Sequence, residues 1–126
     1  MKNEINFKKC AKCGALVEIL KDCKCENCGI KCCGEKLVEV QLNSKDFSVE
    51  KHLPEWEVKD NKIIATVNHV MEDDHYIEWI ACYTKSGKIV KYLNPGDTAQ
   101  VVFDYEKDAT ILSYCNKHGL WYVDVE

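Results

Sequence analysis

From residue 56 onwards, the pattern of hydrophobic and polar positions is that of a β protein, with short apolar runs between polar turns. The runs are rich in Val, Ile, Tyr, Trp and Thr, the residues that best fit a pleated, half-buried surface. The sequence has no helical periodicity, internal repeat or low-complexity tract. The pattern predicts seven strands, at residues 56–59, 62–68, 76–84, 88–93, 98–105, 109–114 and 120–125.

Turn signals separate each predicted strand from the next. They are rich in Gly, Pro, Asn, Asp and Ser, whose backbone preferences and short polar side chains favour turns. The signals are Asp60-Asn61, Glu72-Asp73-Asp74, Ser86-Gly87, Asn94-Pro95-Gly96-Asp97, Lys107-Asp108 and His118-Gly119. Seven short strands at this spacing predict an antiparallel β-sandwich of immunoglobulin-like size.

The first 37 residues follow a different pattern, because cysteine and glycine interrupt them repeatedly. Their clear apolar run, residues 15–20, predicts a short strand with little to pack against. A segment this small cannot bury enough apolar surface to fold alone, so it needs a metal as a staple. Residues 36–42 alternate with period two and predict a strand that leads out of it. We therefore expect a metal-binding domain over 1–37 and a β-sandwich domain over 38–126.

The composition is that of a globular protein with an unusual amount of cysteine. The 126 residues are 46% hydrophobic and 30% charged, and this length allows one core and a small appendage. Seven of the nine cysteines lie between Cys10 and Cys33. In a reducing compartment, such crowding is more typical of metal ligation than of a disulfide framework.

Charge and hydropathy argue against two classes of partner. A net charge of -4 and a pI near 5.6 do not suit a nucleic-acid binder, which usually has a basic face. No apolar run approaches the ~20 residues of a membrane-spanning helix, and the N-terminus lacks the apolar core of a signal peptide. We expect a cytoplasmic protein that binds neither nucleic acid nor membranes.

A candidate metal site begins with Cys115 and His118, which stand three positions apart in a predicted turn. A Cys-x-x-His pair alone is a weak signal, because many such pairs bind nothing. A single histidine near a strand end is usually a surface or core residue, and a single cysteine is usually a small buried hydrophobe. The other three histidines strengthen the signal through their positions: His52, His69 and His75.

The predicted strand order places all five residues at one end of the sandwich. Each strand crosses the domain, so successive loops alternate between its two ends. An even number of strands separates the 69–75 loop from the 115–119 turn, and also from the segment before residue 56. We call this set the His4Cys cluster: His52, His69, His75, Cys115 and His118.

The ligand chemistry of the His4Cys cluster indicates a redox metal. Magnesium and calcium prefer oxygen ligands, and structural zinc usually closes at four ligands. Five nitrogen and sulfur ligands suit iron, with a sixth octahedral position left for a small molecule. A thiolate opposite that position would push electron density toward whatever binds there. The sequence therefore predicts redox chemistry on a diatomic species.

The motifs around this cluster resemble the superoxide reductase family. They are Glu50-Lys51-His52, HVMEDDHYIEWI at residues 69–80, and Cys115-Asn116-Lys117-His118-Gly119. Three further motifs extend the resemblance to the two-iron form, desulfoferrodoxin: Cys10-x-x-Cys13-Gly14, Cys32-Cys33-Gly34-Glu35 and Asn94-Pro95-Gly96-Asp97. The resemblance covers essentially the whole chain. One departure is Val70, where the family commonly has proline.

The resemblance implies that the chain detoxifies superoxide by reducing it, with one electron and two protons, to hydrogen peroxide. It implies that the four histidines bind ferrous iron equatorially and that Cys115 binds it axially. Lys51 matches a lysine near the open position, where a cation would attract superoxide and stabilise a developing peroxide. Glu50 matches a carboxylate that ligates the oxidised iron. Without the resemblance, Glu50 and Lys51 would be interpreted as a solvated charge pair.

A second metal site is predicted among the N-terminal cysteines. In the desulforedoxin-like arrangement that the resemblance implies, four thiolates hold one iron, for which zinc can substitute. We call this set the four-cysteine cluster: Cys10, Cys13, Cys32 and Cys33. Spacing alone also allows a zinc ribbon made of Cys10, Cys13, Cys25 and Cys28. With the first set, Cys23, Cys25 and Cys28 are additional thiols.

Three functions are compatible with the sequence. The first is a superoxide reductase that receives electrons from a small carrier such as rubredoxin. The second is an electron carrier based on the iron–sulfur cage, and the third is a non-catalytic zinc-ribbon interaction module. The carrier does not need a vacant position on a second metal, and the interaction module does not need five more ligands. The resemblance favours the reductase and implies a homodimer.

Overall fold

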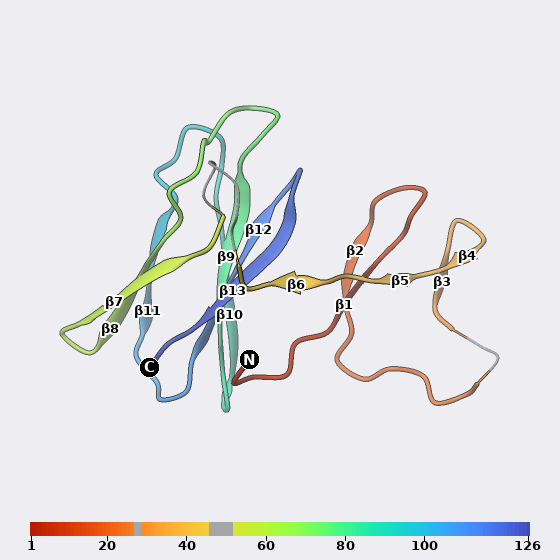
Figure 1. The fold of residues 1–126 in the computed structure, drawn as a ribbon, viewed down its shortest axis with the longest axis horizontal. Coiled ribbons are helices and arrows are strands. Elements are labelled where there is room, and N and C mark those ends of the chain that lie inside the picture. Colours follow the sequence, from red (N-terminus) through yellow and green to blue (C-terminus); the bar gives the residue numbers. More distant parts are fainter. Residues whose placement is uncertain (27–28, 46–51) are drawn as a thin grey trace. The chain divides into compact units, whose positions relative to one another are not determined.

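The structure is a computed structural model that describes residues 1–26, 29–45 and 52–126. It divides into two compact units, Glu4–Gln41 and a larger unit of Met1–Asn3 with Leu42–Glu126 (Figure 1). The regular secondary structure of the described residues consists of β-strands. None of these residues forms a helix that is long and apolar enough to cross a membrane. The predicted mainly β fold is confirmed. The sequence divides the chain between residues 37 and 38, whereas the compact units divide between 41 and 42.

The larger unit is a sandwich of two sheets. One sheet has the strand order β10-β9-β12-β13-β6, and the other has the order β11-β8-β7. The strands are β6 Leu42–Asn43, β7 Glu55–Lys59, β8 Lys62–Thr66, β9 Ile77–Thr84, β10 Gly87–Tyr92, β11 Gln100–Asp104, β12 Thr110–Cys115 and β13 Gly119–Asp124. The seven strands predicted after residue 56 correspond to β7 through β13, and every boundary agrees to within two residues.

The edge formed by β6 differs from the prediction. Residues 36–42 do not form one continuous strand, because β5 pairs with β1 in the small unit while β6 pairs with β13 in the sandwich. The β6–β13 pairing is parallel, so the sandwich is not wholly antiparallel. The side-chain amide of Asn43 fixes this edge by donating a hydrogen bond to the carbonyl of Leu120 at 2.9 Å.

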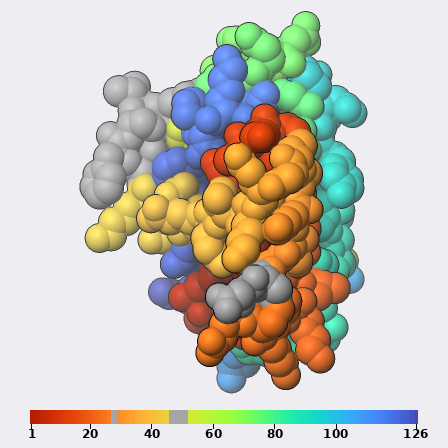
Figure 2. Space-filling view, turned by 90° about the vertical axis from the view of Figure 1, so that its right-hand side faces the viewer, coloured from red at the N-terminus to blue at the C-terminus, as the bar shows by residue number. Residues whose placement is uncertain are grey.

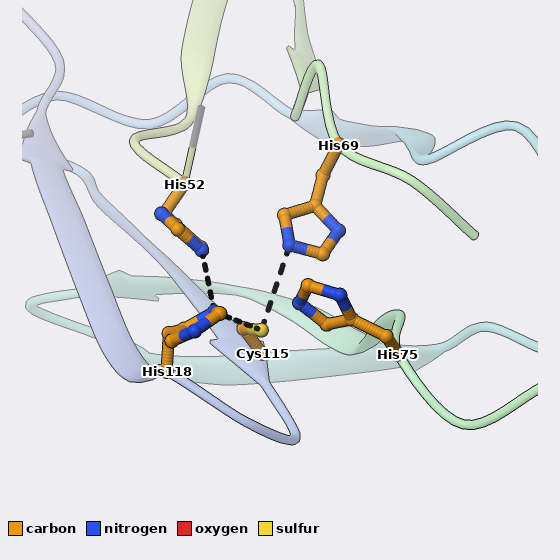
Figure 3. A group of neighbouring side chains, drawn as sticks. All are labelled: His52, His69, His75, Cys115 and His118. Atoms are coloured by element: carbon orange, nitrogen blue, oxygen red, sulfur yellow. Dashed lines mark hydrogen bonds between the residues drawn. The ribbon is translucent and has the colours of Figure 1, made fainter. Parts of the chain in front are cut away.

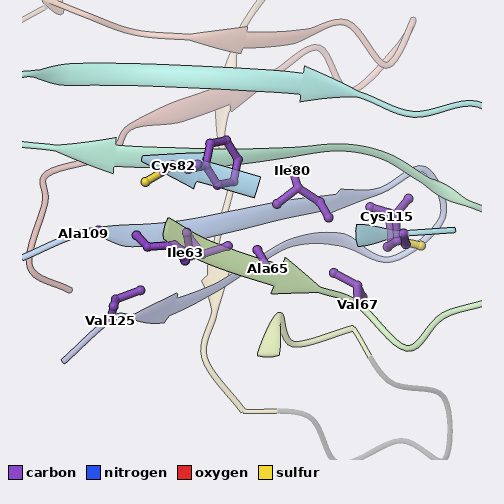
Figure 4. Packing of buried hydrophobic residues seen from close by; sticks show 12 residues of the cluster. Ile63, Ala65, Val67, Ile80, Cys82, Ala109, Cys115 and Val125 are labelled. Atoms are coloured by element: carbon purple, nitrogen blue, oxygen red, sulfur yellow. The ribbon is translucent and has the colours of Figure 1, made fainter. Parts of the chain in front are cut away.

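The hydrophobic core lies between the two sheets of the sandwich (Figure 4). Ile63 and Phe103 come from the three-stranded sheet, and Ile80, Cys82 and Ile111 come from the five-stranded sheet. Each of these side chains is at most 4% exposed. Burial raises the pKa of the Cys82 thiol to about 11, so this residue stays protonated and packs as a small hydrophobe.

The small unit contains a sheet of order β2-β1-β5 and a hairpin of β3 and β4. Its strands are β1 Phe7–Lys9, β2 Leu16–Glu18, β3 Lys31–Cys32, β4 Glu35–Lys36 and β5 Val38–Glu39. Its residues run from red through orange to yellow in Figure 2, and their atoms pack closely on one another. Lys8 forms ion pairs with Asp22 at 2.8 Å and Glu39 at 3.6 Å. Such surface pairs add little stability, so strands this short need a further cross-link.

The core predicts how two isoleucines of the same sheet will differ. Ile80 is fully buried in β9, whereas Ile89 in β10 is 53% exposed. Ile80→Ala should lower the free energy of unfolding by about 2–5 kcal/mol, because it leaves a cavity. Ile89→Ala should lower it by less than about 1 kcal/mol. Urea denaturation at fixed metal content measures both values, and equal losses would contradict the assignment of the core.

Candidate metal centre

The structure brings together the five predicted residues of the His4Cys cluster (Figure 3). Each residue offers one nitrogen or sulfur atom, and these atoms all lie within 4.8 Å of one another. Donor atoms bound about 2.0–2.3 Å from a single ion can be at most about 4.6 Å apart. The observed spread is therefore close to the size of one coordination sphere.

Strand ends and loops at one end of the sandwich supply the five side chains. His52 precedes β7, His69 and His75 lie in the loop between β8 and β9, and Cys115 and His118 lie at the β12–β13 hairpin. The hairpin has a three-residue loop, since Cys115 pairs with Gly119. Gly119 has φ +85°, a conformation that suits glycine and closes three-residue hairpins.

A register irregularity in the sheet sets the position of the cysteine. Tyr114 pairs with Trp79, but the next residue, Cys115, pairs with Ile77, so the ladder shifts between Tyr114 and Cys115. Such β-bulges bend a strand and redirect side chains, and they are common beside functional sites. The Cys115 side chain is fully buried within the core cluster, and its sulfur faces the histidines.

The tautomer of the His69 ring can be assigned from its hydrogen-bond partner. Its Nδ1 lies 2.6 Å from the carbonyl oxygen of Val70, which can only accept a hydrogen bond, so Nδ1 carries the proton. Nε2, which is the lone-pair nitrogen of this tautomer of the neutral ring, faces Cys115 Sγ at 3.5 Å. Metal-binding histidines typically donate their second ring N–H in this way. The partner is a backbone carbonyl, so valine at position 70 retains the interaction.

Three other donor atoms converge on the same point. His52 Nε2 lies 3.0 Å from His118 Nδ1, and Cys115 Sγ lies 3.7 Å from that same nitrogen. Three imidazoles and a thiol that share one small volume are the donor set of a transition metal rather than of a hard cation. The side chains present fit an iron ion.

Exposure varies across the His4Cys cluster. Cys115 is fully buried and His52 is 3% exposed. His69 and His75 are half-buried, and His118 is exposed. The Cys115 sulfur and the His52 ring thus lie on the core side, whereas His118 faces solvent, which would give a small molecule access to the metal.

The side chain of Asn116 holds the loop that carries His75. Its Oδ1 accepts a hydrogen bond from the amide of Tyr76 at 3.1 Å, and its Nδ2 donates to the carbonyl of Asp74 at 2.9 Å. The backbone N–H of Asn116 also donates a hydrogen bond to the carbonyl of Tyr76 at 3.3 Å. Asn116, in the hairpin that carries Cys115, is therefore hydrogen-bonded to the residues on both sides of His75, Asp74 and Tyr76. Sequence reasoning assigned no role to this side chain, and its only signal was its place between two ligands.

The structure also gathers the four thiols of the four-cysteine cluster, whose sulfur atoms lie within 4.8 Å of one another. Cys13 Sγ is 3.6 Å from Cys32 Sγ, which is 3.9 Å from Cys33 Sγ. Hydrogen bonding from the backbone of Cys13 lowers the pKa of Cys10 to about 7. The neighbouring thiols, Cys13 first among them, raise the pKa of Cys32 to about 12. A metal would relieve this crowding by replacing the thiol protons.

The alternative zinc ribbon is not gathered in the described residues. Cys25 is in a disulfide and is not a member of the four-cysteine cluster. Cys28, the other residue specific to that alternative, lies outside the described residues. Cys23 is an exposed free thiol. The geometry therefore favours the set that includes Cys32 and Cys33.

Comparison with known proteins identifies the family. A model described as Desulfoferrodoxin matches residues 44–124. The chain belongs to the desulfoferrodoxin family. A desulfoferrodoxin homolog from Archaeoglobus fulgidus is 35% identical over 117 residues, which cover 90% of this chain and 91% of that one. The desulfoferrodoxin of Nitratidesulfovibrio vulgaris is 34% identical over 125 residues, which cover 96% of this chain and 97% of that one.

Solved structures of other proteins have a fold similar to that of this desulfoferrodoxin family member. The superoxide reductase from Treponema pallidum superposes with a TM-score of 0.71, at 24% identity, over 95% of this chain and 98% of that one. A superoxide reductase (1Fe-SOR) from Giardia intestinalis gives a TM-score of 0.53 at 26% identity, over 61% of this chain and 98% of the other. The first likeness concerns the whole fold of the chain.

Two predicted catalytic residues, Glu50 and Lys51, lie outside the described residues. Their roles stay predictions. They directly precede His52 in the sequence, and His52 is a member of the His4Cys cluster.

Asn116→Ala should loosen the loop that carries His75, because it removes both side-chain hydrogen bonds to that loop. The amide of Tyr76 should then exchange its hydrogen about tenfold faster, the change expected for about 1.4 kcal/mol of lost protection. Asn116→Asp keeps the acceptor for Tyr76 and should give a smaller change. NMR hydrogen exchange measures this rate, and an unchanged rate in Asn116→Ala would refute the role of Asn116.

Proposed function

We propose that this protein is a superoxide reductase with a mononuclear non-haem iron at the His4Cys cluster. The reaction is O₂•⁻ + e⁻ + 2H⁺ → H₂O₂, and it detoxifies superoxide. The convergence of five nitrogen and sulfur donors within 4.8 Å carries the proposal. Membership of the desulfoferrodoxin family and the likeness to the Giardia intestinalis superoxide reductase support it.

The residues of the His4Cys cluster have separate tasks in this proposal. Iron bound there supplies the electron for superoxide. The four imidazoles would hold the ion as neutral nitrogen donors. The buried Cys115 thiolate would bind the ion from the core side, and its negative charge would favour electron transfer from the ion to a small molecule. The exposed side of the cluster lets superoxide in and hydrogen peroxide out.

Lys51 and Glu50 act at the open position in this proposal. The chain has a net charge of -4, so an approaching superoxide anion meets repulsion unless a local cation attracts it. Lys51 supplies that cation next to His52 and stabilises the developing peroxide. Glu50 would supply a carboxylate ligand to the oxidised iron.

The four-cysteine cluster is proposed to bind a second iron, with zinc as a substitute. Four thiolates at close range suit a tetrahedral ion of this kind. Electrons reach the protein from a small carrier such as rubredoxin. We propose a cytoplasmic location, since seven of the eight described cysteines form no disulfide. We also propose a homodimer, since the short strands of the small unit would gain buried surface by pairing.

Two other functions use less of the observed geometry. An electron carrier needs the four-cysteine cluster alone, and a zinc-ribbon interaction module needs no second donor set. Neither requires a cysteine inside the sandwich core to face four histidines. The reductase accounts for both clusters.

Replacement of Cys115 tests the proposed function. In the iron-loaded protein, Cys115→Ser should slow superoxide reduction by on the order of a hundredfold or more, because a neutral hydroxyl cannot supply the charge of a thiolate. The visible absorption of the four-cysteine cluster should persist. Cys82→Ala is the matched control, since Cys82 is equally a buried sandwich cysteine but belongs to neither cluster. Stopped-flow mixing with superoxide measures the rate, and normal turnover in Cys115→Ser would refute the proposed role of Cys115.

Replacement of Lys51 tests electrostatic attraction of the substrate. Lys51→Ala should slow superoxide capture by about tenfold at low ionic strength. The difference should shrink as salt shortens the Debye length to about 8 Å at 0.15 M. Lys51→Arg retains the charge and should stay near the normal rate, as should Lys59→Ala at an exposed site in β7. A capture rate that does not change in Lys51→Ala at any salt concentration would remove Lys51 from the proposal.

A further inference from the structure

Trp121 contacts two members of the His4Cys cluster that come from distant parts of the chain. It is the third residue of β13. Its indole ring lies flat against the imidazole of His52, with a centroid distance of 4.7 Å and an interplanar angle of 14°. Its Nε1–H donates a hydrogen bond to the backbone carbonyl of His118 at 3.0 Å. One side chain thus contacts the ring of one candidate ligand and the main chain of another.

The stacking contact fixes the plane of the His52 ring. Rotation of the imidazole about its side-chain bonds would break the parallel arrangement with the indole, which stabilises aromatic pairs. The backbone of His52 is held from the same hairpin, because Ser113 Oγ donates to the His52 carbonyl at 3.1 Å. The β12–β13 hairpin therefore positions both the main chain and the ring of His52.

The hydrogen bond from Trp121 acts on a residue in an exposed loop. His118 lies between Asn116 and Gly119, in the turn of the hairpin, and its side chain is exposed. A donor fixed in β13 orients the peptide that follows His118, and this restricts the direction of its side chain. The outcome is visible in the site, where His52 Nε2 and His118 Nδ1 point toward each other across 3.0 Å.

We infer that Trp121 is a positioning residue that orients His52 and His118 for metal binding. The inference rests on the proposed metal site. A site whose ligands are already oriented loses less side-chain freedom when the ion binds. Trp121 therefore increases metal affinity and sets the symmetry of the coordination sphere without being a ligand itself. A residue that only packed against the domain would change stability but not these two properties.

The test uses cobalt(II), whose visible bands report the number and arrangement of ligands. One equivalent of zinc, which has no such bands, first fills the four-cysteine cluster of the full-length protein, since thiolates select zinc. The dissociation constant of cobalt at the His4Cys cluster is then measured by competition with a chelator. This readout does not depend on superoxide chemistry.

Two variants separate the two contacts. Trp121→Phe retains an aromatic face for His52 but loses the N–H donor, and it should raise the dissociation constant about threefold. Trp121→Leu loses both contacts and should raise it about tenfold or more. In both variants the cobalt bands should shift, and more so in Trp121→Leu. Trp56→Phe and Trp56→Leu are matched controls, because Trp56 is also a half-buried tryptophan and packs against the hydrophobic core. Their dissociation constants should stay within about twofold of that of the original protein.

The results distinguish this inference from the proposed function. If the original protein binds no cobalt at the His4Cys cluster, the proposed metal site is wrong. If it does, but both Trp121 variants keep its affinity within about twofold and its spectrum, the role of Trp121 is wrong. Circular dichroism checks folding. Should Trp121→Leu not fold, Trp121→Phe decides alone: a shifted spectrum with weaker binding supports the inference, and an unchanged spectrum and affinity overturn it.

Discussion

Cys115 belongs to two environments at the same time, and the candidate site depends on that fact. Its side chain is fully buried among the apolar residues between the sheets. Its sulfur lies within 3.7 Å of nitrogens from His69 and His118. A ligand that is part of the core cannot move without disturbing the packing of the whole sandwich. The fold thus fixes one corner of the site, and the histidines assemble around it from loops.

The hairpin between β12 and β13 organises those loops. It carries two members of the His4Cys cluster and, through Asn116, holds the backbone on both sides of a third, His75. Through Ser113 and Trp121 it also holds His52. Segments far apart in the sequence are therefore tied to one short element. Such second interactions fix ligand orientation in metalloproteins and affect metal affinity strongly.

The strands of the sandwich and the convergence of the five residues of the His4Cys cluster could both be predicted from the sequence. Turn residues such as Asn61, Gly87 and Gly96 mark strand ends clearly, and they adopt positive φ in the structure. Counting strand crossings then places distant loops at one end, since this depends only on connectivity. The parallel pairing of β6 could not be predicted, because two residues carry no pattern.

The details that orient the ligands were also beyond the sequence. The register shift at Tyr114 and Cys115 depends on how two strands pair, and strand pairing has no local signal. The contacts of Trp121 could not be told from ordinary core packing. The choice between the two cysteine sets needed three-dimensional distances, because both sets have acceptable spacing.

Anomalous diffraction at the iron absorption edge tests the central claim most directly, with crystals of the iron-loaded protein. The account predicts a peak about 2.0–2.3 Å from one donor atom of each member of the His4Cys cluster. No peak at that position, or an iron that contacts three or fewer of the five residues, would contradict it.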